Sequence, residues 1–410
     1  MMAGMMIWHK HVGRICAAAL VGALVAGPAG AAVCQKDMPF ERWLEGVKQE
    51  ALAKGISQAT LAAGLPDMVY DPAIIKRDRG QGVFQQSFLQ FSDRMAAAFR
   101  IQGGIAQIKK YQDLFNRVER QYGVPAPVLT AFWALESDFG SSSGKLPVLR
   151  SVTTLAYDCR RPDFFRTQTI DALRIIQRGD LEPSAMIGDW AGELGAMQFT
   201  PSDYYNYAVD FDGDGRRDLV RSVPDTVASA SNFLVHLGWQ RGEPWLQEVN
   251  VPANLPWQEA GIDVQHPRSQ WVGWGVTAAH GALLPADTLS ASLLLPMGRF
   301  GPAFLVYPNF KAFLGWNSAM VYSTTVAYLA TRIAGAPPVS RGSQPIAVLT
   351  TEQVTNLQRL LVSRGFSTGQ PDGRLGAETR GAVKKAQMKL GLPADSYPTV
   401  ELIERLGSAR

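Results

Sequence analysis

Apolar residues recur at helical spacing along much of the chain. The segment FERWLEGVKQEALAKG, residues 40–55, places an apolar residue every three or four positions and ends at a glycine. Similar patterns continue to about residue 122 and from 125 to 199, with prolines where helices start and glycines where they break. SVPDTVASASNFLVHLGW, residues 222–239, predicts a further helix. The centre of the chain is therefore predicted to be mainly α-helical.

The pattern changes between about residues 245 and 312. Prolines and glycines become frequent there, and short runs such as SASLLLPM and AFLVYPNF are typical of strands. Helical spacing resumes at about Trp316. We expect a small β-rich insertion in a helical domain.

Near the C-terminus, the segment GAPPVSRGSQP is rich in proline, glycine and serine and has no helical period. It predicts a linker at residues 336–347. The remaining residues, 348–410, are enough for a small separate module. The main domain is then expected to span residues 33–335.

The first 32 residues have the layout of an export signal. A basic start with Lys10 and Arg14 precedes an apolar stretch, Pro28, and small residues typical of a signal-peptidase site. The alternative is an uncleaved membrane anchor, but the apolar stretch is shorter than the roughly 20 residues that a span needs. The residues before Cys34 also make a poor lipobox, so a lipid anchor is disfavoured.

Composition narrows the class of protein. With 410 residues, 46% of them hydrophobic, the chain can bury a core and is not disordered. The net charge of +4 mildly favours an anionic partner, and the absence of a dense basic tract argues against nucleic acid. Removal of the signal leaves Cys34 and Cys159, which we expect to form a disulfide in an oxidising compartment; two free thiols are the alternative.

Glu136 is the strongest candidate for an acid catalyst. In VPAPVLTAFWALESDFG it follows Phe132 and Trp133 at helical spacing and lies near the expected helix end at Gly140. Burial against aromatic rings and the negative end of the helix dipole both raise a carboxyl pKa, as a general acid requires. The alternative is a solvated glutamate at a helix end.

A second carboxylate would be needed by most glycosidases. Asp138 is close in sequence, but side chains two positions apart on a helix do not face each other, so we expect it to face solvent. Glu193 lies in AGELGAMQFTPSDYY, where the glycines indicate a loop shaped for close approach of a ligand or backbone. Its role stays open at this point.

Several ordered motifs resemble the lytic murein transglycosylase B family over roughly residues 36–335. They are LESDFG (135–140), GDWAGELGAMQFTPSDYYNYAVDFDGDGRRDL (188–219), HLGW (236–239) and FLVYPNFKAFLGWN (304–317). The resemblance implies a lysozyme-like helical core with an extra helical domain and a small β insertion. It also implies a periplasmic enzyme that acts on peptidoglycan glycan strands.

The resemblance assigns roles to single residues. The family's catalytic glutamate falls on Glu136, and Gln198 corresponds to a residue that orients the sugar. Asn317 and Tyr322 correspond to cleft residues, although Ala319 stands where the family has serine. We group Glu193 with the substrate-binding candidates and not with the catalytic ones.

The family's chemistry supplies the missing partner of Glu136. The resemblance implies cleavage of the β-1,4 bond between MurNAc and GlcNAc without water. The glutamate protonates the leaving oxygen and then takes the proton of the muramyl C6 hydroxyl, which closes onto C1 to give a 1,6-anhydro end. No second carboxylate and no cofactor is needed for this reaction. Cell-wall synthesis or division proteins are expected as partners, and the chain is expected to be a monomer.

The segment DFDGDGRRDLVRSVPD, residues 210–225, begins like an EF-hand loop. Its alternating aspartates and glycine suit a hard cation, yet Arg221 stands where such a loop has its last glutamate. The family resemblance implies that a longer loop is closed by Asp225. We expect a structural Ca²⁺ held by Asp210, Asp212, Asp214, the Arg216 carbonyl and Asp225. The alternative is an Asp/Gly turn that binds metal weakly or not at all.

The C-terminal module resembles the peptidoglycan-binding domain type 1, a three-helix unit, over residues 348–406. The matching positions include Leu357-Gln358, Asp372-Gly373 and Gln387, and Ala386 departs from the usual phenylalanine. A generic helical cap or a dimerisation unit is the alternative for this module. For the whole chain, the alternatives are a water-using muramidase on the same core and a non-catalytic wall-binding protein.

Overall fold

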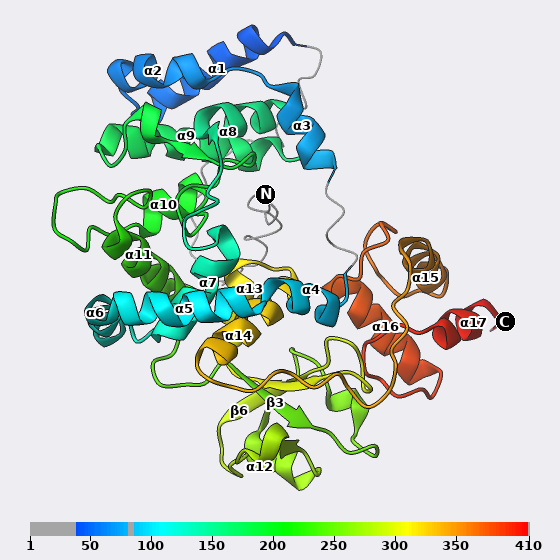
Figure 1. Ribbon diagram of the computed structural model, residues 1–410. Coiled ribbons are helices and arrows are strands. Elements are labelled where there is room, and N and C mark those ends of the chain that lie inside the picture. Colours follow the sequence, from blue (N-terminus) through cyan, green and yellow to red (C-terminus); the bar gives the residue numbers. More distant parts are fainter. Residues whose placement is uncertain (1–37, 81–85, 409–410) are drawn as a thin grey trace, which may run out of the picture. The chain divides into compact units, whose positions relative to one another are not determined.

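A computed structural model describes residues 38–80 and 86–408. These residues divide into two compact units, formed by residues 38–80 with 132–233 and by residues 86–131 with 234–408. The predicted signal at residues 1–32 and Cys34 lie outside the described residues. Figure 1 labels the elements of both units.

The first unit is built almost entirely from helices. They are α1 (Phe40–Ala53), α2 (Gln58–Gly64), α3 (Pro72–Arg79), the second half of α7 (Ala126–Ser137), α8 (Val148–Tyr157), α9 (Pro162–Arg178), α10 (Pro201–Tyr207) and most of α11 (Val223–His236). A short antiparallel pair, β1 (Leu146–Pro147) with β2 (Ile187–Gly188), joins the chain before α8 to the chain after α9. The helices predicted for residues 40–55 and 222–239 are thereby confirmed.

Helix α1 follows the apolar pattern of its sequence. It buries Trp43, Val47 and Ala51, which are four positions apart and lie on one face. Just beyond the helix, Gly55 has a φ of 84°, a left-handed conformation that glycine adopts without a steric penalty. The glycine therefore ends the helix, as the sequence predicted.

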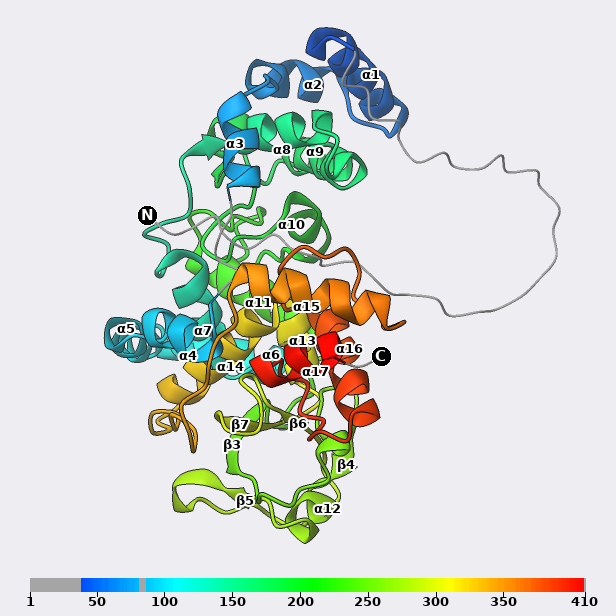
Figure 2. The same cartoon turned by 90° about the vertical axis from the view of Figure 1, so that its right-hand side faces the viewer.

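Helix α8 is buried along almost its whole length, and α9 lies beside it in both views (Figures 1 and 2). The pair forms the support for the chain that follows β2. Ser151 of α8 donates a hydrogen bond from Oγ to the carbonyl of Asp189 at 3.1 Å. The segment after β2 is thus attached directly to a buried helix.

The second unit contains a helical part and the β insertion. Its helices are α4 (Phe88–Met95), α5 (Ala98–Lys110), α6 (Gln112–Tyr122), α12 (Arg268–Gly273), α13 (Phe310–Trp316) and α14 (Met320–Ile333). Helix α14 is buried on most of its surface and contacts α4 and α5. Helix α13 begins at Phe310, earlier than the predicted resumption at about Trp316, because Phe310 and Phe313 pack into the core on one face.

The β insertion is a five-stranded antiparallel sheet in the order β4-β6-β7-β3-β5. The strands are β3 (Leu246–Asn250), β4 (His266–Pro267), β5 (Thr277–Ala278), β6 (Ser290–Leu294) and β7 (Ala303–Val306). The runs SASLLLPM and AFLVYPNF supply its two neighbouring central strands, β6 and β7 (Figure 2). Trp271 of α12, fully buried, anchors the core below the sheet.

The C-terminal module has three helices, α15 (Thr351–Ser363), α16 (Ala377–Lys389) and α17 (Val400–Ser408). Their core contains Leu357, Val383, Leu402 and Ala386, the last fully buried at the position where a phenylalanine was expected. The predicted fold class, mainly α with a small β insertion and a three-helix module, is confirmed.

Side chains of the module also bind main-chain groups of the β insertion. Arg380 donates to the carbonyl of Pro296 at 2.8 Å, and Lys384 donates to that of Ala260 at 2.7 Å. In return, the buried carboxylate of Asp395 accepts the N–H of Arg299 at 3.0 Å. In the described part of the chain, no helix has the length and apolar character needed to cross a membrane.

Candidate active site

Glu136 is the penultimate residue of α7 and is 7% exposed. Phe132 and Trp133, one helical turn before it, are buried as well. The structure therefore places Glu136 at the C-terminal end of a buried helix, next to aromatic residues, as the sequence predicted. A carboxyl group in such a position can deliver a proton without competition from bulk water.

The chain leaves α7 through three consecutive left-handed residues. Asp138, Phe139 and Gly140 have φ angles of 47°, 60° and 88°. The Oγ of Ser137 accepts the N–H of Gly140 at 2.8 Å and donates to the carbonyl of Ala196 at 2.5 Å. Asp138 is half-buried and lies one residue beyond the helix, so the prediction that it sits on the helix and faces solvent is only partly met.

The segment from residue 188 to 199 folds back on itself beside this helix end. Bridges pair Gly188 with Leu194 and Leu194 with Phe199. A Cβ on Gly195 would lie 2.1 Å from the carbonyl oxygen of Leu219, and one on Gly192 would lie 2.3 Å from a methyl group of Val152. These glycines let one main chain approach its neighbours closely, which agrees with the predicted loop.

Gln198 lies in this segment in a left-handed conformation, with a φ of 48°, and is 2% exposed. Its Nε2 donates to the carbonyls of Gly195 at 2.8 Å and Ser143 at 3.3 Å. Its buried Oε1 has no hydrogen-bond partner among the described residues. The side chain is thus held by its amide nitrogen, and its oxygen is left as an acceptor for a ligand hydroxyl or amide.

Asp189 lies in the same segment and was not predicted from the sequence. It is 3% exposed, and its Oδ1 accepts the N–H groups of Ala191 and Glu193, both at 2.9 Å. Burial raises the pKa of Asp189 to about 6, although these backbone N–H groups and Arg77 act in the opposite direction. An aspartate before glycine-containing turns is a known turn signal and could have identified it.

Glu193 is also buried, at 4% exposure. Its main chain is tied to Asp189, whose N–H donates to the Glu193 carbonyl at 3.1 Å. Burial lowers the pKa of Arg161, and the negative charges of Asp78 and Glu193 act against that shift. Glu193 therefore lies in a buried charged environment, and its predicted part in substrate binding stays a prediction.

Asn317 and Tyr322 belong to the second unit. Asn317 follows α13, is 3% exposed, and accepts the N–H of Ala319 on Oδ1 at 2.9 Å. Tyr322 lies in the first turn of α14 and is fully buried. Their predicted contact with sugar stays a prediction.

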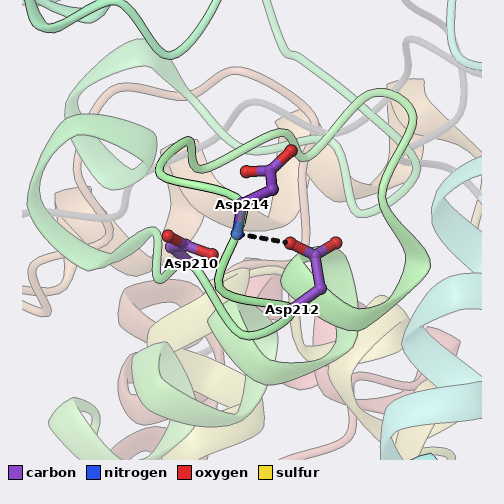
Figure 3. A group of neighbouring side chains, drawn as sticks. All are labelled: Asp210, Asp212 and Asp214. Atoms are coloured by element: carbon purple, nitrogen blue, oxygen red, sulfur yellow. Dashed lines mark hydrogen bonds between the residues drawn. The ribbon is translucent and has the colours of Figure 1, made fainter.

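Three aspartates gather in the loop before α11. Carboxylate oxygens of Asp210, Asp212 and Asp214 lie within 4.8 Å of one another (Figure 3). The loop turns through Gly213 and Gly215, whose φ angles are 80° and 90°. Three oxygen donors at this spacing form a partial shell of the kind that Ca²⁺ takes.

Asp225, the predicted closing ligand of the loop, lies at the start of α11, and its ligand role stays a prediction. It is fully buried, and its oxygens accept the N–H groups of Phe211 at 2.7 Å and Asp218 at 2.8 Å. Burial raises its pKa, and these N–H groups act in the opposite direction. Asp225 thus holds the two arms of the loop together from the start of α11, while the predicted use of the Arg216 carbonyl stays a prediction.

Cys159 is disulfide-bonded. The predicted second half of that bond, Cys34, lies outside the described residues. Beside Cys159, Arg160 and Arg161 both bind the buried carboxylate of Asp78 at 2.6 Å. The bond thus joins a segment that is already fixed by ion pairs to α3.

Comparison with known proteins identifies both parts of the chain. Residues 39–331 match the family described as "Transglycosylase SLT domain", and residues 350–406 match "Putative peptidoglycan binding domain". The chain is 29% identical over 252 residues to membrane-bound lytic murein transglycosylase B of Escherichia coli K12, covering 60% of this chain and 68% of that protein.

Solved structures agree. The structure of SltB3 from Pseudomonas aeruginosa in complex with NAG-anhNAM-pentapeptide superposes with a TM-score of 0.84 at 39% identity, covering 90% of this chain and all of that one. Escherichia coli Slt35 in complex with calcium gives a TM-score of 0.60 at 26% identity, covering 71% of this chain and 92% of that one. The chain therefore belongs to the transglycosylase SLT family, and it is a peptidoglycan lytic transglycosylase with a C-terminal peptidoglycan-binding domain.

Proposed function

We propose that Glu136 alone performs the proton transfers of this enzyme. Protonated, it donates to the glycosidic oxygen between MurNAc and GlcNAc; as a carboxylate, it then removes the proton of the muramyl C6 hydroxyl, which closes onto C1. The bond from C1 of MurNAc to the oxygen of the leaving GlcNAc breaks, and a bond from the C6 oxygen to C1 forms. Glu136 gives one proton and takes one back, so it ends in its starting state. The observation that carries the proposal is the burial of Glu136 at the end of α7, beside the turn that holds Gln198.

In this proposal, Gln198 positions the muramyl ring. Its fixed amide and open, buried Oε1 suit a hydrogen bond to a sugar amide or hydroxyl. Such a bond would hold the muramyl ring so that its C6 hydroxyl can reach C1, and the rate gain would come from effective molarity. SltB3 was solved with NAG-NAM-pentapeptide as well as with the anhydro product, which supports peptidoglycan fragments as ligands of this chain.

Product mass tests this mechanism. Purified sacculi are digested with the protein, and the released fragments are analysed by mass spectrometry. We expect 1,6-anhydro ends, which are one water lighter than reducing ends. Reducing ends as the main product would instead indicate a hydrolytic muramidase on the same fold.

We also propose that the Asp210–Asp214 loop binds a structural Ca²⁺. Its three gathered carboxylates supply hard oxygen donors, and the calcium complex of Slt35 supports the choice of ion. Calcium would supply no proton or bond-making step here. It would stabilise the loop that precedes α11, next to Leu219, whose carbonyl accepts the N–H of Ala196 at 3.4 Å.

For location, we propose export to the periplasm by the signal at residues 1–32. The substrate lies there, and the disulfide of Cys159 fits an oxidising compartment. The mass of the mature chain from a periplasmic fraction tests this. A chain that retains residues 1–32 would favour an anchor, as the name of the Escherichia coli relative would suggest.

A further inference from the structure

The turn at residues 189–193 is closed by one side chain. Asp189 accepts the N–H groups of Ala191 and Glu193 on Oδ1, both at 2.9 Å. Its own N–H donates to the Glu193 carbonyl at 3.1 Å, and its carbonyl accepts the N–H of Gly192 at 3.2 Å. The conformation of the turn therefore depends on Asp189.

The ionised carboxylate of Asp189 is energetically unfavourable at this buried position. The residue is 3% exposed, and Oδ2 has no partner in the part of the chain that the structure describes. An asparagine would offer the same acceptor to Ala191 and Glu193 without a buried charge. The turn therefore needs the acceptor oxygen of Asp189 and not its charge.

Charged groups around the turn offset part of the cost of burying the Asp189 charge. Arg77 of α3 acts to lower the pKa of Asp189, as the N–H groups do, but burial outweighs them. The next residue of α3, Asp78, binds Arg161 at 2.6 Å, and Glu193 acts on Arg161 as a second negative charge. The two hydrogen bonds to Oδ1, and not the charge, therefore fix the conformation of the turn.

A short series of hydrogen bonds connects the turn to α7, the helix that carries Glu136. Leu194 and Phe199 exchange two main-chain hydrogen bonds, at 2.8 and 2.9 Å. Between them, the carbonyl of Ala196 accepts the Oγ of Ser137 at 2.5 Å, one residue from Glu136. A shift of the 189–193 turn would therefore move the support of both Gln198 and the end of α7.

We propose that Asp189 is a positioning residue of the transglycosylase reaction: its carboxyl group closes the 189–193 turn by accepting two main-chain N–H groups and thereby holds Gln198 and the Glu136 end of α7 in their reactive arrangement. This inference rests on the proposed function of Glu136. It assigns to Asp189 no contact with substrate.

The test compares kcat and KM of the full-length enzyme with Asp189→Asn and Asp189→Ala, on soluble peptidoglycan fragments between pH 5 and pH 8. Asp171→Asn is the matched control, because Asp171 is equally buried, at 4% exposure, and binds Arg174 and Ser202 away from the turn. Melting temperatures are measured for every variant. The wild type and Glu136→Gln in the same assay test the proposed function separately.

We expect Asp189→Ala to lower kcat by about 10- to 100-fold with little change in KM, as misplacement of reacting groups does. Asp189→Asn keeps the acceptor for Ala191 and Glu193, so its kcat should stay within about threefold of wild type. The kcat of Asp171→Asn should also stay near that of wild type. A folded Asp189→Ala variant with the wild-type kcat would overturn the proposal. If Asp189→Ala fails to fold, a folded Asp189→Asn variant whose kcat falls about 100-fold would overturn it.

Discussion

At the scale of single residues, the buried carboxyl groups of the first unit differ in how their charge is compensated. Asp78 binds two arginines at 2.6 Å each. Asp225 has main-chain N–H donors on both oxygens. Asp189 has N–H donors on one oxygen only, and burial raises its pKa to about 6. Of these three, Asp189 is therefore the group whose ionisation should weigh most on folding stability.

The sign of that effect follows from linkage. A carboxyl whose folded pKa, about 6, lies above its ordinary value of 3.8 binds its proton more tightly in the folded state. Its contribution to stability is therefore lost as pH rises from about 4 to about 6 and stays lost above that range. Asp189→Asn has no such titration.

We therefore predict that the free energy of unfolding of Asp189→Asn, relative to wild type, increases by on the order of 3 kcal/mol between pH 4 and pH 7. Urea unfolding at both pH values measures this difference. A difference that is the same at both pH values would contradict the burial of an ionised Asp189.

At the scale of elements, the active-site loop depends on glycines in two distinct ways. Gly195 has a φ of 70°, and a Cβ there would lie 2.1 Å from the carbonyl oxygen of Leu219. Gly179, which caps α9, has a φ of 81° but no atom within 4 Å of the same position. An alanine at Gly195 would therefore add a steric clash to backbone strain, whereas an alanine at Gly179 would add backbone strain alone.

We predict that Gly179→Ala lowers the free energy of unfolding by about 1 kcal/mol, the usual cost of a left-handed alanine. Gly195→Ala should lower the free energy of unfolding by roughly 3 kcal/mol or more. It should also lower kcat, because the active-site loop must move away from the carbonyl of Leu219. Chemical denaturation and activity assays check both. Equal losses for the two variants would contradict the close approach at Gly195.

The loop at residues 210–214, the proposed calcium site, is a second element whose role can be measured. If Ca²⁺ binds only the folded protein, about 100 times its Kd should add about 2.7 kcal/mol of stability. We predict a rise in melting temperature for wild type and for the exposed control Asp263→Asn, and a much smaller one for Asp214→Asn. An unchanged melting temperature of the wild type in millimolar Ca²⁺ would count against the site.

Sequence patterns predicted elements better than they predicted contacts between them. Local spacing predicted the helix that ends near Glu136, strands β6 and β7, and the alternating aspartates at residues 210–214. Local spacing did not predict that α7 ends before Asp138 through three left-handed residues, or that the oxygens of Asp225 accept loop N–H groups. Asp189 was missed because its burial depends on α3 and α8, which are distant in sequence.

At the scale of the whole molecule, the C-terminal module adds a second contact with the wall to the catalytic domain. Linked binding sites raise avidity through effective concentration. The bonds from Arg380 and Lys384 to the β insertion also restrict the freedom of the module in the second unit. A chain that ends at residue 347 lacks this module.

We predict that this shortened chain cleaves soluble fragments within about twofold of the full-length rate but binds sacculi at least about tenfold more weakly. Co-sedimentation with sacculi and turnover of soluble fragments measure the two effects. Unchanged binding would show that the module is a structural cap and not a wall-binding unit.

The central claim is that one carboxyl group, Glu136, carries the chemistry. The most direct measurement compares kcat of wild type, Glu136→Gln and Asp138→Asn on soluble fragments, with melting temperatures as the check on folding. Asp138 is a suitable control because asparagine tolerates its left-handed conformation, with a φ of 47°. We predict that Glu136→Gln loses about 10²- to 10⁴-fold in kcat, while Asp138→Asn stays near wild type. A folded Glu136→Gln variant that releases anhydro fragments at the wild-type rate would contradict the account.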